Sequence, residues 1–318
     1  RAAGIKSEAC GNIGRPMVEF LTSDNSVTLV VELSSFQLEF VDQFRPDVGV
    51  LLNITPDHLN WHEGFEAYTE AKLKMFARQT SSDWAITNES CLRLIDFGQA
   101  RKLIFGRSPG VFIKDQWIVH DLKGGLRRIL KLGDLPLRGA HNLANAMAAT
   151  AVALTQEVTE EVIATALRDF KGVEHRLDLI LQISGILFYN DSKATNPEAT
   201  IGAIGSFSEE IILLAGGRNK GNDFDQLALE AKGRVKSAIL FGESASEMTN
   251  SFEKHSIQTK KVNSLEEAVR LGIKLAKVGD VVLLSPACAS QDMFSDYQER
   301  GHCFENAVKA EVGLNGKS

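Results

Sequence analysis

The sequence predicts an α/β protein with two domains, each built on a mostly parallel sheet that helices cover. Short, nearly continuous apolar runs alternate along the chain with helical stretches, as they do in parallel sheets buried beneath helices. The length of 318 residues also corresponds to about two average domains. A second alternation of strands and helices starts near residue 177, so we place the domains at residues 1–173 and 174–318.

The first domain is expected to contain a mostly parallel sheet and a small β region. The apolar runs at 27–31 and 48–52 suit strands that are buried on both faces. Short β-like pieces broken by glycines fill residues 84–130 and predict the small β region. Helices are expected over residues 65–79, 141–155 and 158–170.

The second domain has a regular rhythm of strand and helix, which predicts a doubly wound, Rossmann-like sheet. The strand candidates are Ile186–Tyr189, Ile211–Ala215, Ser237–Phe241 and Val281–Leu284. Helical stretches lie near residues 196–205, 223–232, 264–277 and 293–311. The glycines after the second strand lack the full G-x-G-x-x-G pattern, so the sequence does not favour a nicotinamide cofactor.

The composition argues against two classes of partner. The net charge of −6 and the isoelectric point near 5.7 disfavour a general nucleic-acid surface, which is usually basic. No apolar run approaches the roughly 18 residues that span a bilayer. The four cysteines lack metal-ligand spacing and are typical of free thiols in a reducing cytosol. We therefore expect a cytoplasmic protein that binds neither nucleic acid nor membranes.

Polar residues gather where the predicted strands end. In open α/β sheets, ligands bind beyond the carboxyl ends of the strands. These strand ends are Glu32–Gln37, Asn53–His58, Asn190–Lys193, Gly216–Lys220 and Ser285–Ser290. Any single segment could be an ordinary solvated loop, but five of them at five strand ends indicate a ligand site.

Lys72 stands in the middle of an apolar helical stripe. The stripe consists of Phe65, Tyr68, Met75 and Phe76. A lysine in such a place can extend its ammonium to water, or it can be a desolvated amine that is nucleophilic enough to react. Glu32 and His58 could both reach a metal, although imidazole is a less usual Mg²⁺ ligand and a single histidine is more often structural.

Further candidates lie on a predicted helix and at the expected domain boundary. Asn142 and Asn145 are one helical turn apart, and although Asn142 alone could be a helix cap, the two together indicate a ligand-facing edge. His175 and Arg176 lie at the boundary, a usual place for a ligand cleft, and arginine suits phosphate or carboxylate. Gly216–Gly217 would let the backbone approach an anionic ligand.

Five motifs together resemble one family, the Mur ligases, and most closely its D-glutamate-adding members. They are Gly11–Gly14, Glu32–Glu39, Asn53–Leu59, Asn190–Asn196 and Leu284–Ser290. They occur in the order of that family and cover nearly the whole chain. The resemblance implies a central ATPase-like domain over residues 1–173 and an amino-acid-binding domain over residues 174–318.

The resemblance also implies a reaction and its cofactors. ATP would phosphorylate the carboxylate of UDP-N-acetylmuramoyl-L-alanine, and the amine of D-glutamate would attack the acyl phosphate. Two Mg²⁺ ions are implied: Glu32 would hold one, and His58 with a carbamylated Lys72 would hold the other. These three residues would form the catalytic and metal site, and the enzyme would be a monomer with small-molecule partners only.

The resemblance further implies three sets of contact residues. The nucleotide-sugar substrate would contact Asn12, Ser34 and Gln37. The ATP nucleotide would contact Asn142, Asn145, His175, Arg176, Asp191 and Lys193. D-Glutamate would contact Thr195, Lys220, Ser290 and Tyr297.

The chain departs from the family pattern in two places. The glycine-rich phosphate loop is not found after a strand, and the near match Gly313–Ser318 at the chain end is attributed to chance. Asn60–Trp61 stands where the family often has Asp-Arg. We therefore expect a longer natural chain, with this portion inactive by itself. The alternatives are a related ligase like folylpolyglutamate synthase and a truncated binding module without catalysis.

Overall fold

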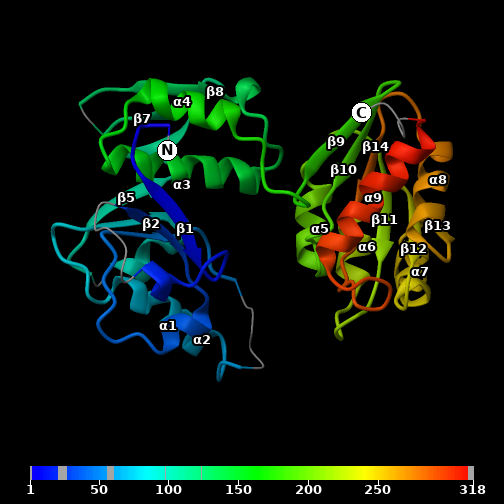
Figure 1. The fold of residues 1–318 in the computed structure, drawn as a ribbon, viewed down its shortest axis with the longest axis horizontal. Helices are drawn as coiled ribbons and strands as arrows, with labels where there is room; N and C mark the ends of the chain where they lie inside the picture. The colour runs from blue at the N-terminus through cyan, green and yellow to red at the C-terminus, as the bar shows by residue number, and fades with distance from the viewer. Residues whose placement is uncertain (1, 21–26, 56–60, 97, 123, 314–318) are drawn as a thin grey trace. The chain divides into compact units, whose positions relative to one another are not determined.

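The structure is a computed structural model, and it describes residues 2–20, 27–55, 61–96, 98–122 and 124–313. The chain divides into two compact units (Figure 1). The first unit contains residues 1–136 and 142–170, and the second contains residues 137–141 and 171–318. The short segment 137–141, which includes the first two residues of the helix Ala140–Thr155, therefore belongs to the second unit.

The first unit is built on a six-stranded sheet and a separate two-stranded sheet. Its strands are β1 (Ser7–Gly11), β2 (Thr28–Glu32), β3 (Val48–Leu51), β4 (Trp84–Asn88), β5 (Arg101–Phe105), β6 (Gly110–Lys114), β7 (Trp117–His120) and β8 (Arg127–Lys131). Its α-helices are α1 (Ser35–Glu39), α2 (Phe65–Leu73), α3 (Ala140–Thr155) and α4 (Glu160–Asp169). Strands β3 to β6 are parallel, and β7 runs antiparallel to both of its neighbours.

Strand β2 corrects one expectation about burial. Its side chains alternate between exposed and half-buried, and Val30 is 61% exposed. The prediction of burial on both faces is wrong here, because β2 pairs with β1 in the two-stranded sheet and not with β3 inside the larger one. An apolar run specifies a strand, but it does not specify how many neighbours the strand receives.

Helices α2 and α3 place candidate residues beside the ends of β2 and β3. Helix α2 is shorter than the expected helix over 65–79 and continues from Lys74 to Phe76 as a 3₁₀ turn. Helix α3 packs its alanines and Met147 against the core of the larger sheet. Small side chains let a helix lie close to a sheet, which sets the distance between α3 and the strand ends.

The second unit is a doubly wound sheet, as the sequence predicts. Its strands are β9 (Asp178–Ile183), β10 (Ile186–Asn190), β11 (Ile211–Gly216), β12 (Val235–Phe241), β13 (Gln258–Lys261) and β14 (Val281–Leu284). Its helices are α5 (Pro197–Ile204), α6 (Asp225–Ala231), α7 (Ala245–Lys254), α8 (Leu265–Leu275) and α9 (Tyr297–Glu311). The strand order is β13-β12-β11-β14-β10-β9, and all neighbours are parallel except β9 with β10.

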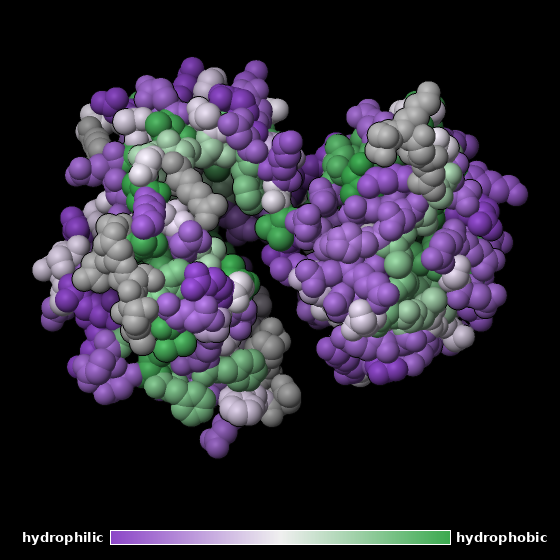
Figure 2. All heavy atoms as spheres, viewed as in Figure 1, coloured by the Kyte–Doolittle hydropathy of each residue, from purple (hydrophilic) through white to green (hydrophobic). Residues whose placement is uncertain are grey.

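The second sheet is buried on both faces. Ile211, Leu213 and Ala215 of β11 belong to the core under α5, α6 and α7, while Ile212 and Leu214 belong to the core under α8 and α9. Figure 2 shows a mostly hydrophilic outer surface over α9, whose inner side holds Phe304 and Val308. No helix among the described residues is long and apolar enough to cross a membrane.

Candidate functional site

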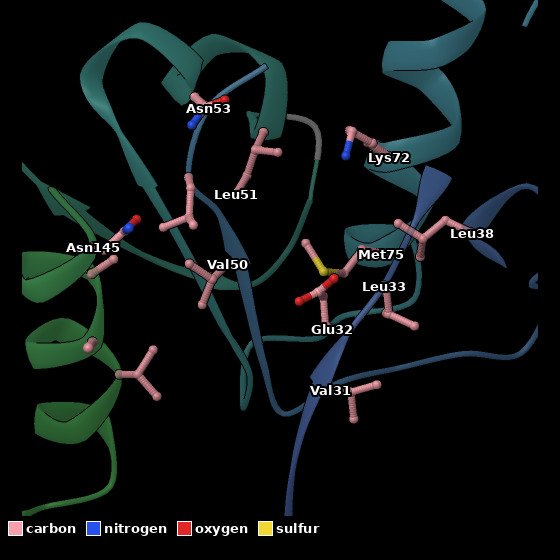
Figure 3. A pocket seen from close by; sticks show the side chains of 14 residues that line it. Val31, Glu32, Leu33, Leu38, Val50, Leu51, Asn53, Lys72, Met75 and Asn145 are labelled. Carbon is pink, nitrogen blue, oxygen red and sulfur yellow. The ribbon is translucent and has the colours of Figure 1, made fainter. Parts of the chain in front are cut away.

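The first unit contains a cavity of about 530 Å³ at the ends of β2 and β3. Three predicted residues line it: Glu32 from the end of β2, Lys72 from α2 and Asn145 from α3 (Figure 3). The other lining residues are Val31, Leu33, Leu38, Val50, Leu51, Leu52, Asn53, Met75, Ala148, Ala149 and Val152. The cavity therefore combines an apolar wall with a few convergent polar groups, which is the usual composition of a small-molecule site.

Glu32 is held by Asn12, which follows the neighbouring strand. The side-chain amide of Asn12 donates to Oε1 of Glu32 over 2.9 Å, and its backbone N–H donates to the Glu32 carbonyl over 2.8 Å. The strand ends lie so close that a Cβ on Gly11 would stand 2.3 Å from that carbonyl oxygen. Gly11 also has φ +101°, so glycine is needed here for two reasons.

Lys72 points into the cavity from α2 (Figure 3). It is half-buried, and its Nζ lies 5.1 Å from the centre of the Tyr68 ring, within range of a cation–π interaction. Tyr68 is itself buried and packs edge-on to His62. The predicted apolar stripe is present at Tyr68 and Phe76, whereas Phe65 is 39% exposed. Lys72 thus sits at the edge of the core with its amine directed into the cavity.

Ser34 and Gln37 bind each other at the start of α1. The Gln37 N–H donates to the Ser34 hydroxyl over 3.2 Å, and the Ser34 N–H donates to Oε1 of Gln37 over 2.9 Å. This capping box fixes the turn that follows Glu32. A role of the two side chains in substrate contact stays a prediction.

The remaining candidates of the first unit differ in exposure. Asn145 is exposed and lines the cavity, whereas Asn142, one turn earlier on α3, is only 9% exposed and does not. His58 lies outside the described residues. Among the residues that the structure describes, no group of three or more His, Cys, Asp or Glu side chains could hold a metal ion.

In the second unit, Asp191 at the end of β10 is buried and hydrogen-bonded within the unit. Its two carboxylate oxygens accept from the Ser285 hydroxyl over 2.7 Å and from the Leu177 N–H over 3.1 Å. Burial raises the pKa of the Asp191 carboxyl to about 7, against the opposing effects of these hydrogen bonds and of Arg176. The side chain therefore joins β10 to β14 and to the turn before β9.

His175 is also turned inward. Its ring is 2% exposed, and Nδ1 accepts from the side-chain amide of Asn190 over 2.9 Å. The ring rests on Gly301, where a Cβ would stand 2.2 Å from Nδ1. The His175 carbonyl accepts from the Lys193 N–H over 3.0 Å. His175 thus supports the Lys193 loop, and of the predicted pair only Arg176 is exposed.

The predicted acceptor residues lie on loops that are joined at one edge of the sheet. Arg218 and Ala289 exchange two backbone hydrogen bonds of 2.9 and 3.1 Å, which link the loop of Lys220 to the loop of Ser290. The Lys193 ammonium lies 5.9 Å from the ring of Tyr297. Lys220 is exposed, Thr195 is half-buried and Ser290 is 1% exposed.

The residue that the sequence analysis missed is Arg300 on α9. It is fully buried and donates to atoms of Ser192 and Cys288. The helix around it is rich in charged residues and resembles a solvated helix. The available signal is its spacing: Arg300 lies four and eight residues before Phe304 and Val308, on the apolar face.

The chain matches two protein families. The Mur ligase middle domain matches residues 14–153, and the Mur ligase glutamate ligase domain matches residues 175–288. Among curated relatives, the UDP-N-acetylmuramoylalanine–D-glutamate ligase of Clostridioides difficile is 43% identical over 307 residues, covering 94% of this chain and 68% of that protein. The ligase of the same name from Thermoanaerobacter sp. is 39% identical over 320 residues, covering 96% of this chain and 70% of that protein.

Solved structures show the same fold at low identity. The MurF ligase of Thermotoga maritima in complex with ADP superposes with a TM-score of 0.66 at 20% identity, covering 92% of this chain and 69% of that one. E. coli FolC in complex with DHPP and ADP superposes with a TM-score of 0.64 at 19% identity, covering 90% of this chain and 67% of that one.

Proposed function

This chain belongs to the Mur ligase family, and from that premise we propose the reaction that it performs. It is an ATP-dependent ligase of peptidoglycan precursors that joins D-glutamate to UDP-N-acetylmuramoyl-L-alanine. The observation that carries this assignment is 43% identity over 94% of the chain to a ligase of that name. The two matched domain families occur in the same order as the two structural units.

The reaction proceeds through an acyl phosphate. The γ-phosphoryl group of ATP moves to the substrate carboxylate, and ADP leaves. The neutral amine of D-glutamate then attacks the acyl carbon and loses a proton, an amide bond forms, and inorganic phosphate leaves with the electron pair of the broken C–O bond. Little covalent chemistry falls to the protein, so its main tasks are positioning and charge stabilisation.

The cavity of the first unit suits a magnesium-assisted phosphoryl transfer. Mg²⁺ is usually bound by one or two carboxylates together with substrate phosphates and water, so the single carboxylate of Glu32 fits that chemistry. Asn12 orients this carboxylate. When bound, the metal would neutralise charge on the phosphates. The proposed second ion depends on His58 and Lys72.

We propose that Lys72 is carbamylated. Its neutral amine would add to CO₂, forming a carbamate and releasing a proton. The product is an anionic oxygen ligand in place of a cation, which suits a half-buried position at the cavity edge. The stem of Lys72 would remain against Tyr68.

The second unit would bind the amino-acid acceptor and part of the nucleotide. Lys220 and Ser290 could hold the two carboxylates of D-glutamate, with Thr195 and Tyr297 beside them, and Lys193 would contact the nucleotide. For the nucleotide, Arg176 offers an exposed group on this unit. The buried His175 and Asp191 would act mainly by holding the loops of Arg176 and Lys193.

On the first unit, Asn145 offers the nucleotide an exposed group, and the buried Asn142 lies one turn earlier on the same helix, α3.

Phosphate release by the complete gene product tests the assignment. Release from ATP should require both UDP-N-acetylmuramoyl-L-alanine and D-glutamate, and the product should contain the new amide. Preference for another amino acid would overturn the acceptor assignment. Activity with a folate acceptor would instead favour the alternative ligase. We further propose that the enzyme works as a cytoplasmic monomer on small molecules, which sedimentation of the purified protein would check for its oligomeric state.

A further inference from the structure

We propose that Arg300 is a positioning residue for the amino-acid acceptor, because its buried guanidinium joins the loops that carry the acceptor contacts. The inference rests on the proposed function and deepens it. Arg300 lies on α9, and its side chain donates to Ser192 and Cys288, which are not themselves predicted substrate contacts.

All three nitrogens of the guanidinium donate hydrogen bonds, and together these bonds join two loops. Nε donates to the Ser192 hydroxyl over 3.0 Å, and Nη2 donates to the Ser192 carbonyl over 2.8 Å. Nη1 donates to the Cys288 carbonyl over 3.1 Å. Ser192 follows β10 and Cys288 follows β14, so a single rigid planar group sets the distance between the two strand-end loops.

The residues next to these contacts are the proposed acceptor contacts. The Ser192 hydroxyl also donates to the carbonyl of Tyr297, a proposed acceptor contact, over 2.8 Å. Cys288 precedes Ala289 and Ser290. A shift of Ser192 relative to Cys288 would therefore move Tyr297 and Ser290 relative to each other.

A third loop rests on the same side chain. A Cβ on Gly217 would stand 3.2 Å from Nη1 of Arg300 and 2.2 Å from the Ala289 carbonyl. The loop after β11 therefore lies directly on the guanidinium before it continues to Lys220. The hydrogen bonds between Arg218 and Ala289 connect this loop to the loop of Ser290, so the two loops move together.

Fold stability alone does not account for a buried cation here. Arg300 is 0% exposed, its guanidinium donates to one hydroxyl and two carbonyls, and the Asp292 carboxylate favours its charged form electrostatically. Burial lowers the pKa of the guanidinium to about 10, so it remains charged at neutral pH. Apolar residues of similar volume often match or exceed the stability of such buried charges. Burying this charge is unfavourable for stability, so its presence indicates that the loops need a fixed geometry.

The test uses Arg300→Met and Arg300→Lys in the complete gene product, with Phe304→Leu as the control. Phe304 is also fully buried on α9, one turn further along, and it belongs to the apolar core. For each protein, kcat and the KM values for D-glutamate, ATP and the nucleotide sugar are measured, together with Tm. The wild type must first show turnover that depends on D-glutamate, because its absence would refute the proposed function and not this inference.

We expect Arg300→Met to raise the KM for D-glutamate about tenfold or more, with a smaller rise in the KM for ATP because Lys193 follows Ser192. Arg300→Lys should recover part of the loss, because an ammonium can still donate to one or two of the carbonyls. Phe304→Leu should lower Tm without changing the KM for D-glutamate. An unchanged KM for D-glutamate in Arg300→Met, or an equal rise in all three KM values, would overturn the proposal.

Hydrogen exchange gives a readout that does not depend on turnover. The amides of Arg218 and Ala289 bond to each other's carbonyls and should exchange faster in Arg300→Met, or in Arg300→Lys if the methionine variant does not fold. In Phe304→Leu, the exchange rates of these two amides should keep the same ratio to the rates of the other amides of the unit as in the wild type. Equal protection in all variants would show that Arg300 does not hold the loops.

Discussion

The side-chain amide of Asn12 donates a 2.9 Å hydrogen bond to the carboxylate of Glu32, and the two residues stand at the ends of neighbouring parallel strands. The family resemblance implies different tasks for them, substrate contact for Asn12 and metal binding for Glu32. The structure shows that one orients the other. The Glu32 side chain lines the cavity (Figure 3), where an orienting hydrogen bond of this kind would serve a metal-binding carboxylate.

Replacing Asn12 should therefore weaken metal-dependent activity more than stability. We expect Asn12→Ala to raise the Mg²⁺ concentration needed for half-maximal phosphate release by roughly 10–100-fold, the usual effect of losing such an orienting partner. Because Asn12 is exposed, Tm should change little. Ile13→Ala, an exposed neighbour, is the matched control. An unchanged Mg²⁺ requirement in Asn12→Ala would show that the hydrogen bond does not serve the metal site.

Carbamylation of Lys72 can be observed directly. With ¹³C-bicarbonate in the buffer, the wild-type protein should give a carbamate carbon resonance, and Lys72→Arg should abolish it, because a guanidinium does not form a stable carbamate. Lys74→Arg is the control, since Lys74 lies two residues further on and donates to the Glu39 carbonyl. A resonance that persists in Lys72→Arg, or that is absent from the wild type, would refute the modification.

Four strands of the second unit are predictable because their side chains are buried, whereas β9 and β13 are not predicted. Strands β10, β11, β12 and β14 consist mostly of apolar side chains that face helices on both sides of the sheet. Such apolar runs differ clearly in hydrophobicity from the segments around them. The edge strand β13 reads Gln-Thr-Lys-Lys and is mostly exposed, so no apolar signal marks it. Helix α7 was missed for a related reason: its buried side includes Met248 and Phe252 within a polar stretch.

The sequence predicts where the candidate site lies, but it does not predict which of its side chains point outward. Parallel strands bring their carboxyl ends to one edge, so the residues following β10, β11 and β14 could be expected near each other. Whether a polar side chain points outward depends on the chain packed against it. His175 and Asp191 turn inward because α9 and β14 offer them contacts, and Arg300 is buried although its helix looks solvated.

Asp191 should make the stability of the second unit depend on pH. Its folded pKa of about 7 lies above the unfolded value of 3.8, so the folded state binds this proton more tightly. The resulting stability is fully present below about pH 4 and is lost as the pH rises through about 7, with an upper limit of ~4 kcal/mol.

Hydrogen exchange of the core amides of β11 and β14 measures the free energy of unfolding of this unit. Between pH 5 and pH 8 the wild type should lose more stability than Asp191→Asn, which cannot titrate. Glu230→Gln, an exposed change on α6, should follow the wild type. The prediction would be contradicted by parallel pH curves for the wild type and Asp191→Asn.

A pair of helical glycines tests how His175 is held. Gly301 on α9 faces the His175 ring, and an added Cβ would stand 2.2 Å from Nδ1 and 2.7 Å from Cε1. Gly202 on α5 is also helical, but nothing lies within 4 Å of its would-be Cβ. The same substitution to alanine therefore meets a buried ring in one helix and open space in the other.

We expect Gly301→Ala to destabilise the second unit by about 1–3 kcal/mol, the usual cost of overpacking a core. The displaced ring would also shift the His175 carbonyl that accepts from the Lys193 N–H, so the KM for ATP should rise. Gly202→Ala should be neutral or stabilising by up to ~1 kcal/mol, because alanine favours the helix. Urea unfolding and steady-state kinetics measure both effects. Equal stability of the two variants would show that α9 yields around the ring, and that His175 does not depend on Gly301 for its place.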